Sequence, residues 1–204
     1  MLLVSGDALL QRMSVQAGPG VMAAAEAALR SITPVLESVL DTVFAFSTRT
    51  DIFDVSVRGT RRFSLSQGFV VADEPIEVRV ARPDEVLTAA GQGVVLSPAK
   101  YTLDTEKGEV KLLDGAVPGR LTLSVGYSAG FEEQDQVYEE VPAWLQEAAL
   151  VLASRSMNAY LLSHRRVDVR DVSAELHRLS TTLINSHFRS RVGVAFPSSI
   201  ILQE

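Results

Sequence analysis

The sequence predicts an α+β protein with a helical core, a β-rich middle segment and extended arms at both ends. The stretch that begins at Met22 places apolar residues three and four positions apart, which is the spacing of a helix that buries one face, and a second helix is expected from Pro142. Residues 51–127 instead alternate apolar and polar side chains, which is the period of a half-buried strand. We therefore expect residues 20–50 and 128–188 to form the helical core and residues 51–127 to form a β-rich insertion.

The first nineteen residues carry Gly6, Gly18 and Pro19 around a short apolar patch at residues 8–10. A patch of this length is too brief for an independent helix, so we expect residues 1–19 to be an N-terminal arm. In the helix that follows, Pro34 removes a hydrogen bond and Thr33 can cap a new segment, which predicts a kink or break there. The apolar stripe of this helix consists of Ala25, Leu29, Ile32, Leu36, Val39 and Val43.

The β-rich segment begins with Phe53, Val55 and Val57, which alternate with polar residues. A turn at Gly59 then precedes a second short strand with Phe63 and Leu65. The clearest local signal is a hairpin over residues 101–112, since its turn carries Asp104, which can bond the local backbone, and Gly108, which tolerates a positive φ. In all, further strands are expected at residues 76–81, 101–103, 110–113 and 121–127.

The principal helix is expected from Pro142 to Leu162, because proline suits the first turn of a helix. Residues 150–153 are apolar on every side, so this helix should be buried on more than one side. A final helix is expected from Asp171, a suitable N-cap, and residues 189–204 are expected to form an extended, apolar C-terminal tail. The apolar face of the final helix consists of Val172, Leu176, Leu179 and Leu183.

Charge and composition exclude several classes of function. The 204 residues include no cysteine, which rules out disulfides, thiolate metal sites and thiol nucleophiles. The net charge of −6 divides into −8 for residues 1–140 and +2 for residues 141–204, so no dense basic patch for gripping DNA phosphates is expected. An acidic surface suits either solubility or repulsion of DNA from a channel wall. No eighteen-residue apolar run and no basic leader occur, which predicts a soluble protein made in the cytoplasm.

No constellation for catalysis, cofactor binding or metal binding is visible. His164, His177 and His187 lack the i, i+4 spacing of a helical metal pair and lie in no nucleophile context. The carboxylates before the principal helix follow no calcium-loop order, so they predict a solvated loop. The carboxylates before the principal helix are Glu132, Glu133, Asp135, Glu139 and Glu140. Because none of these groups forms a catalytic arrangement, we expect no enzymatic activity.

One passage resembles a known family. Residues 127–131 read Tyr-Ser-Ala-Gly-Phe, and after an acidic stretch Val141 and Pro142 open a helix that continues with Trp144 and Leu145. This passage, together with the hairpin before it, resembles the joint of head-tail connector proteins, also called adaptor or neck proteins, of long-tailed double-stranded-DNA phages. The β-rich residues 51–127 depart from the smallest members of that family, which are mostly helical.

The resemblance implies a structural protein of the virion neck. Many members form a twelve-subunit ring beneath the portal protein, through which DNA passes towards a downstream neck, stopper or tail protein. On this basis two sets of residues are expected to make contacts. The subunit interface is expected at Leu29, Leu36, Trp144, Leu145, Val151 and Leu152, and the portal-binding tail at Val192, Val194, Phe196, Ile200, Ile201 and Leu202.

Three other interpretations stay open at this point. The tail residues can instead dock on their own chain, as termini often do. The chain can be a tail-completion or stopper protein of the same virion, or a monomeric module that binds a ligand on its sheet. A binding module would need aromatic side chains on an open sheet face. The candidates for that role are Phe53, Phe63, Phe69, Tyr101 and Tyr127.

Overall fold

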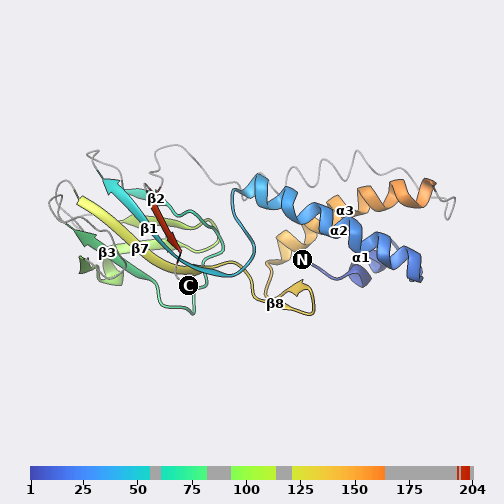
Figure 1. Cartoon of the computed structure of the whole chain (residues 1–204), viewed down its shortest axis with the longest axis horizontal. Helices are drawn as coiled ribbons and strands as arrows, with labels where there is room; N and C mark the ends of the chain where they lie inside the picture. The colour runs from blue at the N-terminus through green and yellow to red at the C-terminus, as the bar shows by residue number, and fades with distance from the viewer. Residues whose placement is uncertain (56–60, 82–92, 114–120, 164–196, 198, 203–204) are drawn as a thin grey trace. The chain divides into compact units, whose positions relative to one another are not determined.

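The computed structural model describes residues 1–55, 61–81, 93–113, 121–163, 197 and 199–202, and it confirms the α+β class (Figure 1). The chain divides into a helical unit, Met1–Leu40 with Phe131–Phe188, and a β unit, Asp41–Gly130 with Arg189–Glu204. The first change of unit therefore lies at Leu40, ten residues before the expected boundary. The predicted final helix from Asp171 lies outside the described residues.

Two long helices form the centre of the helical unit. Helix α2 (Pro19–Leu40) packs against helix α3 (Ala143–Ser163), and the two run antiparallel, since the Tyr160 hydroxyl near the end of α3 donates to the Gly20 carbonyl at the start of α2. Helix α3 matches the predicted principal helix to within one residue at each end. The buried apolar face of α2 consists of Val21, Ala25, Ala28, Leu29, Leu36 and Leu40.

Helix α2 continues through Pro34, so of the predicted kink or break the break does not occur. The Thr33 hydroxyl lies 3.4 Å from the Leu29 carbonyl oxygen, one turn back, and 3.2 Å from the Met1 carbonyl oxygen. Thr33 therefore bonds within the helix and to the N-terminal segment and does not cap a new one. Leu29 before Pro34 and Leu36 after it are both buried, so both halves of the helix pack against the same surface. This packing outweighs the loss of the backbone hydrogen bond that Pro34, which has no N–H, cannot make.

The N-terminal residues also differ from the predicted arm. Helix α1 (Gly6–Arg12) begins with Ser5, whose Oγ accepts from the Ala8 N–H at 3.3 Å, and its Leu9 and Leu10 are buried. Seven residues do not make a stable helix in isolation, so packing against α2 and α3 supplies the missing stability. Tertiary contacts of this kind are not visible in the local sequence.

The β unit contains two antiparallel sheets, which confirm the predicted hairpin and the strands expected near residues 63–65, 76–81 and 121–127. The first strand begins earlier than expected, at Ser47 within the range predicted to be helical, and the strand Val94–Val95 was not predicted. One sheet has five strands in the order β10-β1-β7-β3-β4, and the other has three in the order β2-β6-β5. In the first, β1 (Ser47–Val55) and β7 (Leu121–Ala129) pair along their whole length. The other strands are β2 (Arg62–Ser64), β3 (Glu77–Ala81), β4 (Val94–Val95), β5 (Tyr101–Asp104), β6 (Glu109–Leu112) and β10 (Ser199–Leu202), with a 3-10 turn at Pro98–Lys100.

A single apolar core lies between the two sheets. Phe53 of β1 and Phe63 of β2 meet edge to face with ring centroids 5.3 Å apart, so this pair joins one sheet to the other. The β5–β6 hairpin turns as predicted: the Lys107 N–H donates to the Asp104 carboxylate, and Gly108 adopts a φ of +60°. The remaining core side chains are Leu65, Val70, Val78, Val110, Leu112, Leu123, Val125, Tyr127 and Ala129.

The acidic stretch between β7 and α3 forms a small hairpin where a loop was expected. Strands β8 (Glu133–Gln134) and β9 (Val137–Tyr138) are joined by Asp135 and Gln136, both with positive φ. Leu2 pairs with β9 in parallel, so the N-terminal segment extends the hairpin. The turn has no glycine, which is the usual signal for a two-residue hairpin loop, and this explains why the sequence did not reveal it.

Candidate assembly surfaces

The passage that resembles the connector family starts with a buried tyrosine at the end of β7. The Tyr127 hydroxyl donates to the Asp51 carboxylate at 2.8 Å and lies 3.0 Å from the Ser66 hydroxyl. It also accepts the Gln67 N–H at 3.2 Å. Burial, followed by the nearby charge of Asp51, raises the pKa of Tyr127 strongly, so the hydroxyl keeps its proton and stays a donor. Tyr127 thus ties β7 to β1 and to the loop after β2.

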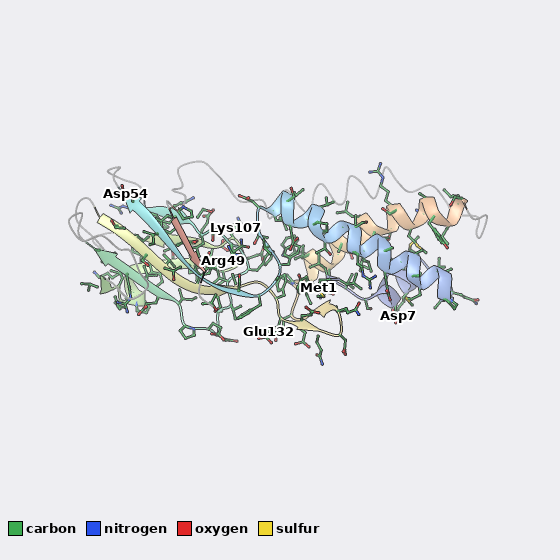
Figure 2. The ribbon with its side chains drawn as sticks, in the orientation of Figure 1. Met1, Asp7, Arg49, Asp54, Lys107 and Glu132 are labelled. Carbon is green, nitrogen blue, oxygen red and sulfur yellow. The ribbon has the colours of Figure 1, made fainter. Side chains whose placement is uncertain are left out.

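Asp51 is the charged centre of this cluster. Its carboxylate accepts from the Ser66 N–H, from the Ser66 hydroxyl at 2.9 Å and from Tyr127, and its side chain is fully buried. Burial raises its pKa and outweighs the hydrogen bonds and the charge of Arg49, which act in the opposite direction. Figure 2 shows Arg49 and Asp54 on β1, on either side of this position along the strand. The two carboxylate oxygens of Asp51 are both hydrogen-bonded within the chain.

The same loop is anchored a second time through Gln67. The Gln67 side-chain oxygen accepts from the Thr42 hydroxyl at 3.0 Å and from the Val43 N–H, and the Gly68 N–H donates to the Thr42 hydroxyl at 3.0 Å. These bonds fix the first residues of the β unit to its core. Sequence reasoning missed the cluster, although Asp51 shares the inward parity of Phe53 on β1, and a carboxylate at an inward position indicates a buried polar network.

Gly130, three residues after Tyr127 in the passage, lies close to the backbone of Phe44 and Ala45. Its φ is +97°, and a Cβ placed there would lie 2.5 Å from the Ala45 carbonyl oxygen and 2.8 Å from that of Phe44. The Gly130 N–H donates to the Phe69 carbonyl. Only glycine fits this position without strain, because other residues rarely adopt such a φ and would collide with Ala45.

The passage ends at the start of α3, as the family pattern implies. The Pro142 carbonyl accepts from the N–H groups of Leu145 and Gln146, and the Gln146 side-chain amide donates to the Val141 carbonyl at 2.8 Å. Pro142 therefore precedes the first turn, where its missing N–H leaves no bond unmade. In this way each conspicuous residue of the passage has a structural role at the strand end or at the helix start.

The residues predicted for the subunit interface mostly face the interior of the chain. Leu29, Leu36, Leu145 and Val151 are buried in the helical unit and offer no free surface in this conformation, and Trp144 and Leu152 are half-buried. The same stripe that identified these helices is what packs them against each other, since an amphipathic pattern marks the core before it marks any partner. Of the six predicted residues, only Trp144 and Leu152 keep partly exposed surface in this conformation.

Helix α2 exposes a different, uncharged face. Val35 and Val39 lie one turn apart and are 49% and 36% exposed. Val39, which the sequence pattern assigned to the apolar stripe, therefore lies on the outer side of the helix. Ala27 and Ser31 continue the same face towards the start of the helix at four-residue spacing, and both are exposed. Scattered surface valines are ordinary, but two in succession on an uncharged helix face form a possible contact surface.

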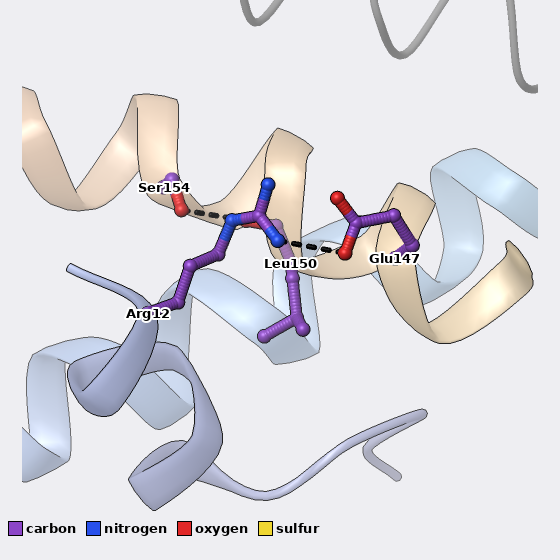
Figure 3. Close-up of polar contacts among 4 residues, drawn as sticks. All are labelled: Arg12, Glu147, Leu150 and Ser154. Atoms are coloured by element: carbon purple, nitrogen blue, oxygen red, sulfur yellow. Dashed lines mark hydrogen bonds and ion pairs between the residues drawn. The ribbon is translucent and has the colours of Figure 1, made fainter. Parts of the chain in front are cut away.

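Helices α1 and α3 are held together by an ion pair at the surface of the helical unit. An Arg12 guanidinium nitrogen lies 2.7 Å from a Glu147 carboxylate oxygen, with the two side chains 31% and 41% exposed (Figure 3). The Ser154 hydroxyl on α3 donates to the Leu150 carbonyl of the preceding turn and so bonds within its own helix. The ion pair joins α1 to α3 and adds to the packing of α1 against both long helices.

The predicted portal-binding tail is described only in part. Ile200, Ile201 and Leu202 belong to β10, which pairs antiparallel with residues 49–52 of β1 at the edge of the five-stranded sheet. This pairing corresponds to docking on the chain itself, the interpretation that the sequence left open. Val192, Val194 and Phe196 lie outside the described residues.

Chemical sites are not evident in the part of the chain that the structure describes. Across those residues no group of three or more histidine, cysteine or carboxylate side chains could hold a metal ion. His164, His177 and His187 fall outside them. Burial and the carboxylates of Glu37 and Glu133 raise the pKa of Tyr138, but this hydroxyl lies in the small acidic hairpin with no nucleophile context. Among the described helices, none has the length and apolar character needed to cross a membrane.

Similarity to known proteins is found at the level of structure. No protein-family model matches the chain, and no curated protein matches it. The chain is similar to a solved chain described as "Neck of empty GTA particle computed with C6 symmetry", with a TM-score of 0.47 and 14% sequence identity over 93% of this chain and 91% of that chain. Similarity at this level carries no conclusion about function.

Proposed function

We propose that the chain is a structural subunit of the neck of a phage-like particle, a head-tail connector that assembles as a ring beneath the portal protein. The proposal rests on one observation: residues 127–149 resemble the joint of that family, and they occupy a strand end, a turn and a helix start in this chain. Tyr127 anchors the strand end, Gly130 allows the close backbone approach, and Pro142 lies at the helix start. These structural roles favour a shared architecture over a chance similarity of sequence.

The surface of α2 supports assembly with other copies. Subunits of a ring contact one another through two different surfaces, and an uncharged helix face with exposed valines suits one of them. Val35 and Val39 provide such a face, whereas the predicted interface residues Leu29 and Leu36 are occupied inside the chain. We therefore place the contact on the exposed side of α2. In this proposal the protein has no enzymatic activity and DNA passes without sequence-specific binding.

A charge introduced on this face tests the proposal. Val35→Asp and Val39→Asp should fold like the wild type, because both side chains are exposed, yet they should lose ring formation. The mass of the particles formed by the purified chain, alone and with the portal protein of the same particle, is the measurement. Ser156→Asp, which adds the same charge at an exposed site on α3, is the matched control. A chain that stays monomeric even with the portal protein would contradict the proposal.

The monomeric binding module is the weaker candidate. It needs aromatic side chains on an open sheet face, but Phe53, Phe63, Phe69 and Tyr127 are all buried. Tyr101 is partly buried against the same core. A tail-completion or stopper protein of the same virion remains the neighbouring alternative, and the mixing experiment separates it, since such a protein would bind a ring of another subunit and not the portal protein.

A further inference from the structure

Strand β10 has the features of an element that can be exchanged between copies. It is four residues long, and among the described strands it pairs with β1 alone, at the outer edge of the five-stranded sheet. Removal of β10 would bare the backbone groups of residues 49–52, and an open edge of this kind readily accepts another strand.

The part of β1 that β10 covers, residues 49–52, includes the buried carboxylate of Asp51. Asp51, the buried carboxylate bonded to Ser66 and Tyr127, stands opposite Ile200 in the register. A bare edge at this position would let water reach a cluster that is otherwise closed. The edge therefore favours replacement of one β10 by another over simple loss of the strand.

A long connection precedes the strand, since the 33 residues 164–196 separate the end of α3 from Pro197. A long connection lowers the effective concentration of the strand at its own sheet, which weakens the preference for its own β1 over that of a neighbour. Within the sheet the two pairings are identical in register and in hydrogen bonds.

We propose that β10 is exchanged in the assembled protein, so that Ser199–Leu202 of one copy pairs with residues 49–52 of the next copy. This inference rests on the proposed ring and names the second copy of this chain as the occupant of the β1 edge. Each copy gives a strand and receives one, which is the head-to-tail contact that closes a ring. Ile200, Ile201 and Leu202 then join subunits and do not contact the portal protein.

Single cysteines test the exchange, since the chain has no cysteine of its own. Arg49 and Leu202 are direct partners, and the Cα atoms of such partners lie about 4.5 to 5.5 Å apart, within the range that a disulfide spans. Arg49→Cys and Leu202→Cys chains are mixed before assembly, oxidised and separated without reductant. We expect a species of twice the 22.1 kDa chain mass that contains one chain of each kind, as read from the linked peptides by mass spectrometry.

The control uses the same oxidation but places the two cysteines at positions that are not cross-strand partners. Ser199 pairs with Ile52 and lies three positions, or about 10 Å, from the partner of Arg49, so Arg49→Cys mixed with Ser199→Cys should give no linked pair above background. Should Arg49→Cys fold poorly, Thr50→Cys with Ile201→Cys tests the same register.

The double variant distinguishes the two failures. Oxidised assemblies of the Arg49→Cys, Leu202→Cys chain should give covalent oligomers if the strand is exchanged. Rings that yield only internally closed single chains would overturn the exchange while leaving the proposed function intact. A chain that forms no ring at all, with or without the portal protein, would overturn both.

Discussion

The helical unit and the β unit are stabilised in different ways. In the β unit, residues far apart in sequence meet through specific bonds and close backbone approaches, such as Asp51 with Tyr127 and Gly130 with Ala45. In the helical unit, packing of apolar stripes dominates, and the side-chain ion pairs are exposed. A specific network fixes one geometry, whereas a stripe tolerates substitution. We expect substitutions to cost more in the β unit than in the helical unit.

The largest loss is expected at Gly130. Gly130→Ala adds a Cβ 2.5 Å from the Ala45 carbonyl oxygen at a φ of +97°, so the free energy of unfolding should fall by about 3 kcal/mol. Chemical denaturation measures this change. Gly18→Ala is the control, because a Cβ there meets nothing within 4 Å and should alter stability by less than about 0.5 kcal/mol. Equal effects at the two glycines would contradict the close approach.

The next largest loss is expected at Asp51. Asp51→Ala leaves the buried Tyr127 hydroxyl and the Ser66 N–H without this acceptor, which should lower the free energy of unfolding by about 2 kcal/mol. Asp51→Asn should lose less, since its amide oxygen can still accept. If Asp51→Ala left the denaturation midpoint unchanged, the network would not be what distinguishes the two units.

The pH dependence of stability sharpens the same point. The pKa of Asp51 is raised by burial above its ordinary value of 3.8, so the folded chain takes up this proton at a higher pH than the unfolded chain. The stability that protonated Asp51 adds to the folded chain is fully present below pH 3.8 and is lost as the pH rises through the raised pKa. Wild type should therefore gain stability relative to Asp51→Asn as pH is lowered from 7 towards 4. A constant difference in denaturation midpoint across this range would contradict the raised pKa.

The smallest effect is expected at the ion pair between α1 and α3. Arg12→Ala should lower the free energy of unfolding by about 0.5 kcal/mol, because both partners are well exposed to water. A double-mutant cycle with Glu147→Ala isolates the pair, and added salt should reduce the coupling. A coupling as large as the loss at Asp51 would remove the contrast between the units.

Much of the fold could be predicted from local patterns. The hairpin of residues 101–112, strand β7 and helix α3 were all visible, because a turn residue, an alternating run or a helical stripe marked each of them. Helix α1 and the continuity of α2 through Pro34 were not, because both depend on packing between segments distant in sequence. The β8–β9 hairpin was missed because its turn carries no glycine.

The candidate contact surface was harder to predict than the fold. The apolar stripe identified Leu29 and Leu36 as contact residues, but the chain itself buries them. Val35 and Val39 are equally apolar, and only the arrangement of α2 against α3 shows which side remains free. A sequence pattern indicates that a face is apolar, while the neighbouring elements decide whether a partner can reach it.

Gly130 and Ala45 touch where the β unit begins and ends, and Ser47 and Ala129 open the ladder between its two longest strands. When the first and last residues of an inserted domain lie close together, the domain can be removed or replaced, since a short linker can join the flanking segments. Apart from its last strand, residues 41–130 thus form a replaceable module within a helical scaffold. Evolution or an engineer can vary what the scaffold carries without rebuilding the scaffold itself.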